Sequence, residues 1–158
     1  MIDTTLLTST LLFADLGADE LAHIAGAAVE RSLRRGDVLF TEGDDPDAIY
    51  IVVNGRIAIA NKSIDGRESV VALMEPGDLF GEMPLFDGLG RSAEARALEP
   101  SAVISIPYAP VRGVYQQRPE ALWSVVKLLA GRIRATDEAL ADSVFLDVTG
   151  RTAKRLLE

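Results

Sequence analysis

The chain has no cysteine among its 158 residues and only one histidine, His23. The lack of cysteine excludes disulfides, thiolate zinc sites, cysteine-ligated iron–sulfur clusters and a cysteine nucleophile, and it is compatible with a cytosolic location. One histidine, on a predicted surface helix, cannot form the histidine cluster with which cupin enzymes bind metal on a double-stranded β architecture. We therefore expect no metal site.

Other features are missing as well. The first Lys or Arg is Arg31, so the N-terminus lacks the basic start of a secretory signal, and no apolar run is long enough to span a bilayer. The net charge of −8 argues against nucleic-acid binding by this piece alone. The patterns GxSxG, GxxxxGK(S/T) and a strand-borne GxGxxG do not occur, so the common types of enzyme are disfavoured. We expect a protein that is not an enzyme.

The pattern of apolar and turn-forming residues changes twice along the chain. The first thirty residues predict helices, because apolar residues recur on one face. From Val29 to Ile106, short apolar runs alternate with turn pairs, which are Gly36-Asp37, Gly43-Asp44, Asn54-Gly55, Asp65-Gly66 and Gly77-Asp78. Asn-Gly and Asp-Gly favour type I′ hairpin turns, in which both central residues need positive φ. The pattern predicts a mainly β sandwich or roll with flanking helices.

A long helix is predicted to start at Pro119. Its residues form two heptad rows, which are Leu122, Leu129, Thr136, Ser143 and Val126, Ile133, Leu140, Asp147. This length exceeds what one roll needs for cover, so we favour dimerisation along the seam over packing on its own domain. Residues 147–150 then predict a hinge, and Thr149 predicts the N-cap of a further helix. Because the chain stops within that helix, we expect a second domain beyond it.

The segment GEMPLFDGLGRSAEARA, residues 81–97, carries the candidate chemistry. Gly81 lets the backbone approach a ligand closely. Arg91 supplies a charged fork of donors and Ser92 a hydroxyl and an N–H, which together predict a phosphate cradle. Glu82 accepts hydrogen bonds only, as a ribose hydroxyl requires. The alternative is an Arg–Glu pair that braces a surface turn.

The run GDLFGEMPLFDGLGRSAEARA resembles the phosphate-binding cassette of cyclic-nucleotide-binding domains, in which F-G-E and two apolar positions precede a variable loop and R-(S/T/A)-A. The stretches LLFADLGADEL, GDVLFTEGD and IYIVVNGRIAI (which we expect to be a hairpin) and the helix ending FLDVTGR extend the likeness over nearly the whole chain. The sequence is similar to the Crp/Fnr (catabolite activator) family of transcription regulators, most like its actinobacterial cyclic AMP receptors.

The resemblance implies a fold and its division. Residues 1–118 would form a jelly-roll-like β-roll (a double-stranded β-helix) with N-terminal helices. Residues 119–146 would form the dimerisation helix, and residues 147–158 the hinge and the start of a winged helix-turn-helix domain.

The resemblance also implies roles for the cassette. Glu82 would hold the ribose 2′-hydroxyl, while Arg91 and Ser92 would hold the cyclic phosphate. Gly81 would give close backbone approach, and Met83 would form an apolar wall.

Residues outside the cassette would complete the implied site. Val71 and Ala72 would flank the base, and Arg132 would be a second cation near the phosphate. Thr136 matches the threonine that meets the adenine amino group. Asp137 stands where serine or asparagine usually reaches the adenine of the other subunit, and a partly buried carboxylate is costly unless it is paired. This departure puts affinity and base choice in question.

The resemblance implies a cytoplasmic homodimer that senses a cyclic nucleotide and controls DNA binding through a domain beyond this chain. Cyclic AMP is the leading ligand, and Ser92 leaves cyclic GMP as an alternative. RNA polymerase is a further candidate partner, and no membrane association is expected. Three other readings stay open. They are the same fold with another effector or none, a domain that regulates a fused enzyme, and Fnr-type redox or haem sensing, which the lack of cysteine disfavours.

Overall fold

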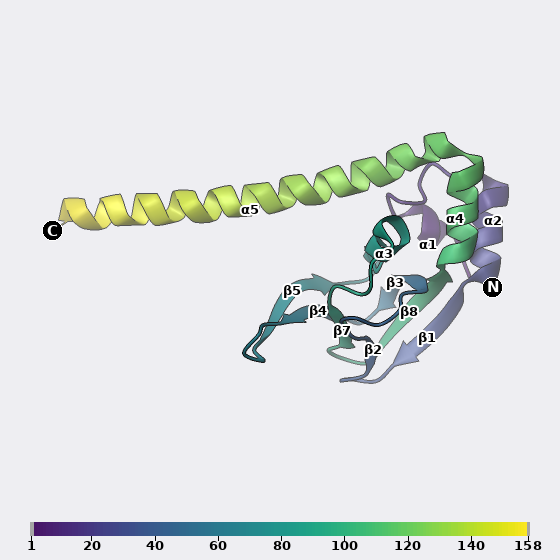
Figure 1. Ribbon diagram of the computed structural model, residues 1–158, viewed down its shortest axis with the longest axis horizontal. Coiled ribbons are helices and arrows are strands. Elements are labelled where there is room, and N and C mark those ends of the chain that lie inside the picture. Colours follow the sequence, from purple (N-terminus) through teal and green to yellow (C-terminus); the bar gives the residue numbers. More distant parts are fainter. Residues whose placement is uncertain (1, 158) are drawn as a thin grey trace.

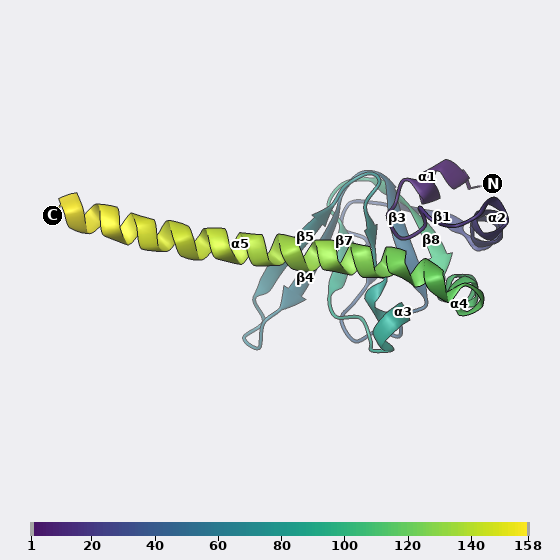
Figure 2. The same cartoon turned by 90° about the horizontal axis from the view of Figure 1, so that it is seen from above.

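The computed structural model describes residues 2–157, with side chains up to Asp142. Two antiparallel sheets form a β-roll, short helices cover one end of it, and one long helix crosses above it (Figure 1; Figure 2). The strands are β1 (Val29–Leu33), β2 (Val38–Phe40), β3 (Ala48–Asn54), β4 (Ile57–Lys62), β5 (Glu68–Met74), β6 (Leu79–Phe80), β7 (Glu94–Ala97) and β8 (Ser101–Pro107). The helices are α1 (Thr4–Thr8), α2 (Ala18–Ala27), α3 (Met83–Asp87), α4 (Tyr108–Gln117), the 3-10 turn η1 (Pro119–Ala121) and α5 (Leu122–Leu157). The expected mainly β fold with flanking helices is confirmed.

The two sheets have the strand orders β1-β8-β3-β6 and β2-β7-β4-β5. Successive side chains of a strand point to opposite sides of the sheet. The first five side chains of β3 are all buried, so both faces of this strand are covered. Ile49 and Ile51 pack in a cluster with the helices, whereas Tyr50 and Val52 pack in a second cluster between the sheets. The helical layer and the roll interior therefore pack on opposite faces of the sheet that contains β3.

Three turns of the roll share one arrangement, in which a Gly-Asp pair ends residues 34–37, 41–44 and 75–78. The glycine of each turn has a φ of 87°, 88° or 91°. The aspartate carboxylate of each accepts a hydrogen bond of 2.8 or 2.9 Å from the backbone N–H three residues earlier. Glycine takes the positive φ without steric cost and aspartate closes the loop, so these turns form as predicted.

The turns at Asn54-Gly55 and Asp65-Gly66 differ from the expected type I′. Only their glycines have positive φ, and no other residue type does within the described chain. Asp65-Gly66 still joins the antiparallel pair β4 and β5. Asn54-Gly55 instead carries the chain from one sheet into the other, so the predicted hairpin over IYIVVNGRIAI was wrong. Both strands are apolar because each is buried in its own sheet, and this pattern resembles that of a hairpin.

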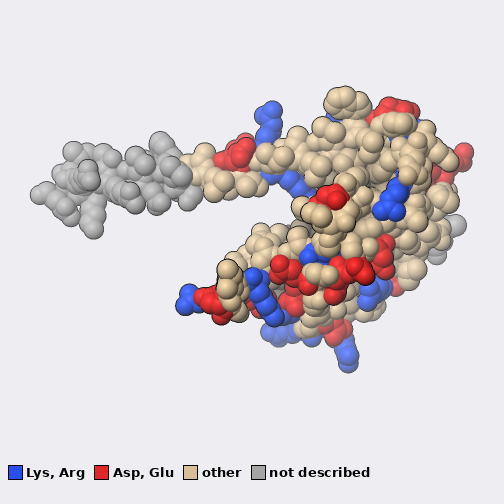
Figure 3. Space-filling model, viewed as in Figure 1, with Lys and Arg blue, Asp and Glu red and all other residues tan. Residues whose placement is uncertain are grey.

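The long helix is anchored on the roll only near its start. Ala121 and Val125 are buried in the helical cluster, and Leu128 and Leu129 pack partly against it. The side chains of residues 133–142 are all exposed. A hollow separates this part of α5 from the β4–β5 hairpin in the space-filling view (Figure 3).

Both predicted heptad rows are largely exposed in the structure. Leu129 packs partly against the helical cluster and Leu122 is 38% exposed, whereas Val126, Ile133 and Leu140 are 50%, 61% and 61% exposed. A second copy could cover such an apolar row, and this dimer contact stays a prediction.

The backbone of α5 continues to Leu157 through residues 147–150, where a hinge was expected, so the predicted N-cap of a separate helix at Thr149 was wrong. One interior glycine costs a helix about 1 kcal/mol, which is too little to end a helix of this length. The side chains of Ser143 and Asp147 lie outside the described residues. A hinge that moves on activation stays a prediction.

Candidate functional site

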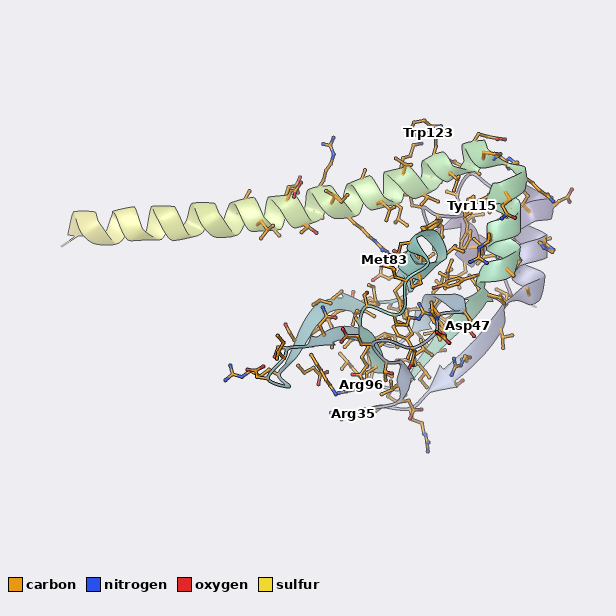
Figure 4. All side chains as sticks on the ribbon, viewed as in Figure 1. Arg35, Asp47, Met83, Arg96, Tyr115 and Trp123 are labelled. Atoms are coloured by element: carbon orange, nitrogen blue, oxygen red, sulfur yellow. The ribbon has the colours of Figure 1, made fainter. Side chains whose placement is uncertain are left out.

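A cavity of about 120 Å³ lies where the β-roll, α3 and α5 meet. It is lined by Phe40, Ile59, Met74, Phe80, Gly81, Glu82, Met83, Pro84, Arg91, Ser92, Ala93 and Arg132. The fold thus brings together six of the ten residues predicted from the sequence, five from the cassette and Arg132 from α5. Met83 lies at the start of α3, below α5 (Figure 4).

Position 81 requires glycine for two reasons, its backbone conformation and the closeness of its neighbours. Its φ is +83°, and a Cβ there would lie 2.9 Å from Arg91 Nη1 and 3.4 Å from the backbone oxygen of Ala48. We expected Gly81 to admit a ligand. In the structure, the lack of a side chain at position 81 leaves room for the guanidinium of Arg91, and a residue larger than glycine would displace it.

Arg91 is 4% exposed, and backbone oxygens hold its guanidinium. Nη1 donates to Gly81 O at 2.8 Å, and Nη2 donates to Ala48 O at 2.7 Å. The guanidinium carbon also lies 4.1 Å from the ring centroid of Phe40, a cation–π geometry. The charge is therefore fixed within the roll beside the cavity.

The phenol of Tyr108 supports this arrangement. Its hydroxyl donates to Gly81 O and accepts a 3.1 Å hydrogen bond from Arg91 Nη1. Burial raises the pKa of Tyr108 to about 12, from an ordinary 10.0, and the charge of Arg91 opposes part of that rise. The sequence did not predict a role for this residue, because no local pattern shows that the end of β8 lies beside the cassette.

The raised pKa of Tyr108 predicts a loss of stability in alkali. The folded state holds the phenolic proton more tightly than the unfolded chain, so this contribution is complete below pH 10 and is lost as the pH rises towards 12. The free energy of unfolding should fall by roughly 2–3 kcal/mol over that range from this group. Urea unfolding of the parent and of Tyr108→Phe at several alkaline pH values measures the difference. An equally steep fall in the variant would contradict the assignment.

Glu82 is 1% exposed and forms an ion pair with Arg132. Its Oε1 faces Arg132 Nη1 but accepts no well-aligned hydrogen bond from the described residues. Arg132 Nη2 also donates to Leu79 O at 3.1 Å. The alternative of a surface pair between Glu82 and Arg91 is therefore wrong, since both side chains are buried and Glu82 pairs with α5.

Four predicted residues do not line the cavity. Ala72 lies opposite Ile59 in the β4–β5 pairing and so shares its face of the sheet, while Val71 falls at the β-bulge and is 55% exposed. Thr136 donates its hydroxyl to Arg132 O at 3.0 Å, back along α5. Asp137 is exposed on α5. The roles of these residues stay predictions.

The cavity also has an apolar wall that sequence reasoning missed, made of Phe40, Ile59, Met74, Phe80, Pro84 and Ala93. These residues come from strands of both sheets, from α3 and from the loop before β7, and only the tertiary fold brings them to one cavity. The alternation of apolar residues indicated that they are buried, but not that they surround a site.

Within the described part of the chain, no group of three or more His, Cys, Asp or Glu side chains is placed to hold a metal ion. No described helix is long and apolar enough to cross a bilayer.

Comparisons with known proteins agree with this architecture. A CRP-like cAMP-activated global transcriptional regulator of Mycobacterium tuberculosis is 37% identical over 124 residues, which cover 78% of this chain and 55% of that protein. The chain therefore spans about half the length of the curated relatives it matches.

Two solved structures match the fold over most of this chain. The N-terminal domain of a transcriptional regulator from Streptomyces coelicolor is 33% identical, with a TM-score of 0.67 over 85% of this chain and 94% of that one. The catabolite activator protein of Thermus thermophilus is 30% identical, with a TM-score of 0.71 over 84% of this chain and 62% of that one.

The family described as the cyclic nucleotide-binding domain matches residues 30–118, which include the cassette and the strands that line the cavity. With the glycine, glutamate and arginine of the cassette gathered at one cavity, the chain belongs to the cyclic nucleotide-binding domain family and has Crp-like transcription regulators among its relatives.

Proposed function

We propose that this chain is the cyclic AMP-sensing part of a dimeric Crp-type transcription regulator. The observation that carries the proposal is the pairing of two chemistries in one cavity: the carboxylate of Glu82 and the donors of Arg91 and Ser92. A carboxylate accepts hydrogen bonds from ribose hydroxyls, and a guanidinium beside a serine binds a phosphate. A cyclic nucleotide offers both groups in one rigid ring system.

The base of the nucleotide would be recognised on the open side of the cavity. Thr136 and Asp137 lie on α5 beyond the last contact of this helix with the roll, and both are exposed. They can meet a base only if α5 and the roll approach each other or if a second copy supplies its own α5. The exposed row Val126, Ile133 and Leu140 supports such a dimer.

DNA binding would belong to a domain beyond this chain. The relatives named as cAMP-activated transcription regulators are about twice as long as the matched part, which leaves room for that domain. The nucleotide can favour one arrangement of α5 only through contacts that differ between the two arrangements. Residues 147–150 are the proposed hinge of that change, and the division at 118 and 146 is proposed with it. A cytoplasmic location and absence of catalysis follow from the same role.

A second candidate is the same fold with a different effector or none. Two observations favour it. Arg132 already forms an ion pair with Glu82, and Asp137 stands where serine or asparagine is expected near the base. Regulation of a fused enzyme is the remaining alternative, and the sequence beyond residue 158 decides it.

Calorimetric titration with cyclic AMP and cyclic GMP tests the function, and 2′-deoxy cyclic AMP tests the part played by Glu82. A hydrogen bond to a charged group contributes about 1.5–3 kcal/mol, so the deoxy ligand should bind roughly 10- to 150-fold more weakly than cyclic AMP. In Glu82→Gln, the difference between the two ligands should shrink. Equal affinity of the parent for both ligands would remove the ribose role, and no binding of either cyclic nucleotide would leave the second candidate.

A further inference from the structure

The last anchor of α5 on the roll, among the described residues, is Arg132. Nearer its start, α5 is held by buried apolar side chains and by Ser124, whose hydroxyl donates to Asp15 at 2.6 Å. Beyond Arg132, the side chains of residues 133–142 are exposed and form no hydrogen bond or ion pair with the roll. The direction in which α5 leaves the roll therefore depends on what holds Arg132.

Arg132 borders two cavities. On one side lies the cavity of about 120 Å³ that contains Glu82. On the other lies a more polar cavity of about 360 Å³, lined by Ser9, Thr10, Leu11, Met74, Gly77, Asp78, Leu79, Leu128 and Arg132. The guanidinium thus has a buried carboxylate on one side and a second, exposed carboxylate, that of Asp78, on the other.

Arg132 has a carboxylate near it on each side, paired directly with that of Glu82 and influenced electrostatically by that of Asp78. Burial lowers the pKa of Arg132, which means that its charged form is poorly solvated, and the charge of Asp78 opposes this effect. Asp78 uses Oδ2 to accept from the N–H of Glu75 at 2.8 Å, within one of the Gly-Asp turns. Its charge remains available to a cation in the second cavity.

A nucleotide that uses Glu82 must compete with Arg132. A ribose hydroxyl that bonds Glu82 Oε1 needs the space and the acceptor that the guanidinium now takes. A cavity of about 120 Å³ is also small for a nucleotide, because ligand pockets usually span roughly 300–1,000 Å³. Among the described residues, Arg132 alone forms an ion pair with Glu82, so its displacement is costly for both charges. A second carboxylate lowers the cost for the arginine, and the ribose hydroxyl lowers it for Glu82.

We infer that Arg132 is a positioning residue with two positions: it pairs with Glu82 in the unliganded protein and moves towards Asp78 when a ribose hydroxyl takes Glu82. The inference rests on the proposed function and deepens it. It makes the contact between α5 and the roll depend on the ligand, since the same side chain lines the cavity and holds the helix. It also gives Arg132 a different role from the phosphate contact that the family resemblance implies.

The binding arm of the test is a double-mutant cycle on cyclic AMP affinity. Asp78→Asn should weaken binding by roughly three- to tenfold in the parent, because the displaced arginine loses its second partner, and it should have no effect in the Arg132→Gln background. Arg132→Gln alone should bind within about tenfold of the parent, or more tightly, because the competitor for Glu82 is gone. The matched control is Asp37→Asn, which changes the equivalent aspartate of another Gly-Asp turn, 2.8 Å from the N–H of Arg34.

The structural arm needs no nucleotide. Because the chain has no cysteine, spin labels can be placed at Glu99→Cys on the roll and Glu138→Cys on α5 without further changes. Diluting labelled chains with unlabelled ones keeps both labels within one copy. In the unliganded parent the distance between the labels should be narrowly distributed, and Arg132→Gln should broaden or shift it. Cyclic AMP should shift it in the parent and change it less in Arg132→Gln.

Each result decides one claim. A loss of binding of more than about a hundredfold in Arg132→Gln would assign Arg132 to the ligand and overturn the two positions. An equal effect of Asp78→Asn in both backgrounds, or an effect matched by Asp37→Asn, would also overturn them. If the parent binds neither cyclic AMP nor cyclic GMP, the proposed function fails. The unliganded label distance then still decides whether Arg132 anchors α5.

Discussion

Replacement of Arg91 by alanine is expected to weaken cyclic AMP binding by roughly 2–4 kcal/mol, because the variant loses a charge-assisted contact and leaves a phosphate oxygen unpaired. The structure adds a second expected result. Arg91 donates to the backbone oxygens of Ala48 and Gly81; Gly81 O keeps the Tyr108 hydroxyl as a donor, but Ala48 O loses the donor that Arg91 supplies. The free energy of unfolding should fall by about 1–3 kcal/mol as well. Calorimetric titration measures the first quantity, and urea unfolding measures the second.

Two further variants separate binding from stability. Arg91→Lys keeps the charge but not the fork of donors, so it should retain part of the affinity while losing much of the stability. Arg96→Ala is the matched control on the neighbouring strand, because Arg96 forms its ion pairs with Glu94 and Glu68 near the surface. Surface pairs of this kind contribute about 0–1 kcal/mol. Unchanged cyclic AMP affinity in Arg91→Ala would refute the phosphate role, and unchanged stability would refute the structural role.

Replacement of Gly55 by alanine is expected to destabilise the roll by roughly 3–5 kcal/mol, the sum of an unfavourable φ and a steric clash. Gly55 has a φ of +88°, and a Cβ there would lie 2.1 Å from Ser101 Oγ and 2.7 Å from Ser101 Cα. Ser101 cannot move aside, because its own Cα is part of β8 and its hydroxyl accepts from the N–H of Arg56 at 3.1 Å. The midpoint of urea unfolding, compared with the parent at constant slope, measures the loss.

Gly66→Ala supplies the matched control. Gly66 has nearly the same φ, +83°, but no atom lies within 4 Å of its added Cβ. It should therefore lose only the conformational part, about 1–2 kcal/mol. If the two variants were equally destabilised, the contact between Gly55 and Ser101 would contribute nothing.

The crossover at Gly55 also shows where sequence reasoning reached its limit. Asn54-Gly55 was recognised as a turn, and it is one. That the turn joins two sheets, rather than two strands of one hairpin, depends on β8 and β6 pairing with β3. Those partners follow β3 by dozens of residues, and no local pattern encodes which strand will lie beside it.

The cassette shows the same division. Its motif placed Gly81, Glu82, Arg91 and Ser92 at one site from the sequence alone. The motif did not show that Arg91 is held by the oxygens of Gly81 and Ala48, nor that Tyr108 lies beside it. These contacts join elements that meet only when the roll closes, and they make the cassette arginine part of the core as well as part of the site.

By itself the sequence determined what depends on composition and on neighbouring residues: the lack of cysteine, the Gly-Asp turns, the cassette loop and the apolar rows of α5. Backbone preferences and short motifs act over a few residues, so they can be read along the chain. The tertiary structure alone decided that Glu82 is buried against Arg132 and that Arg132 lies between Glu82 and Asp78. The physical reason is that a buried carboxylate takes whichever cation the packing of α5 brings to it, and that packing is set by the whole fold.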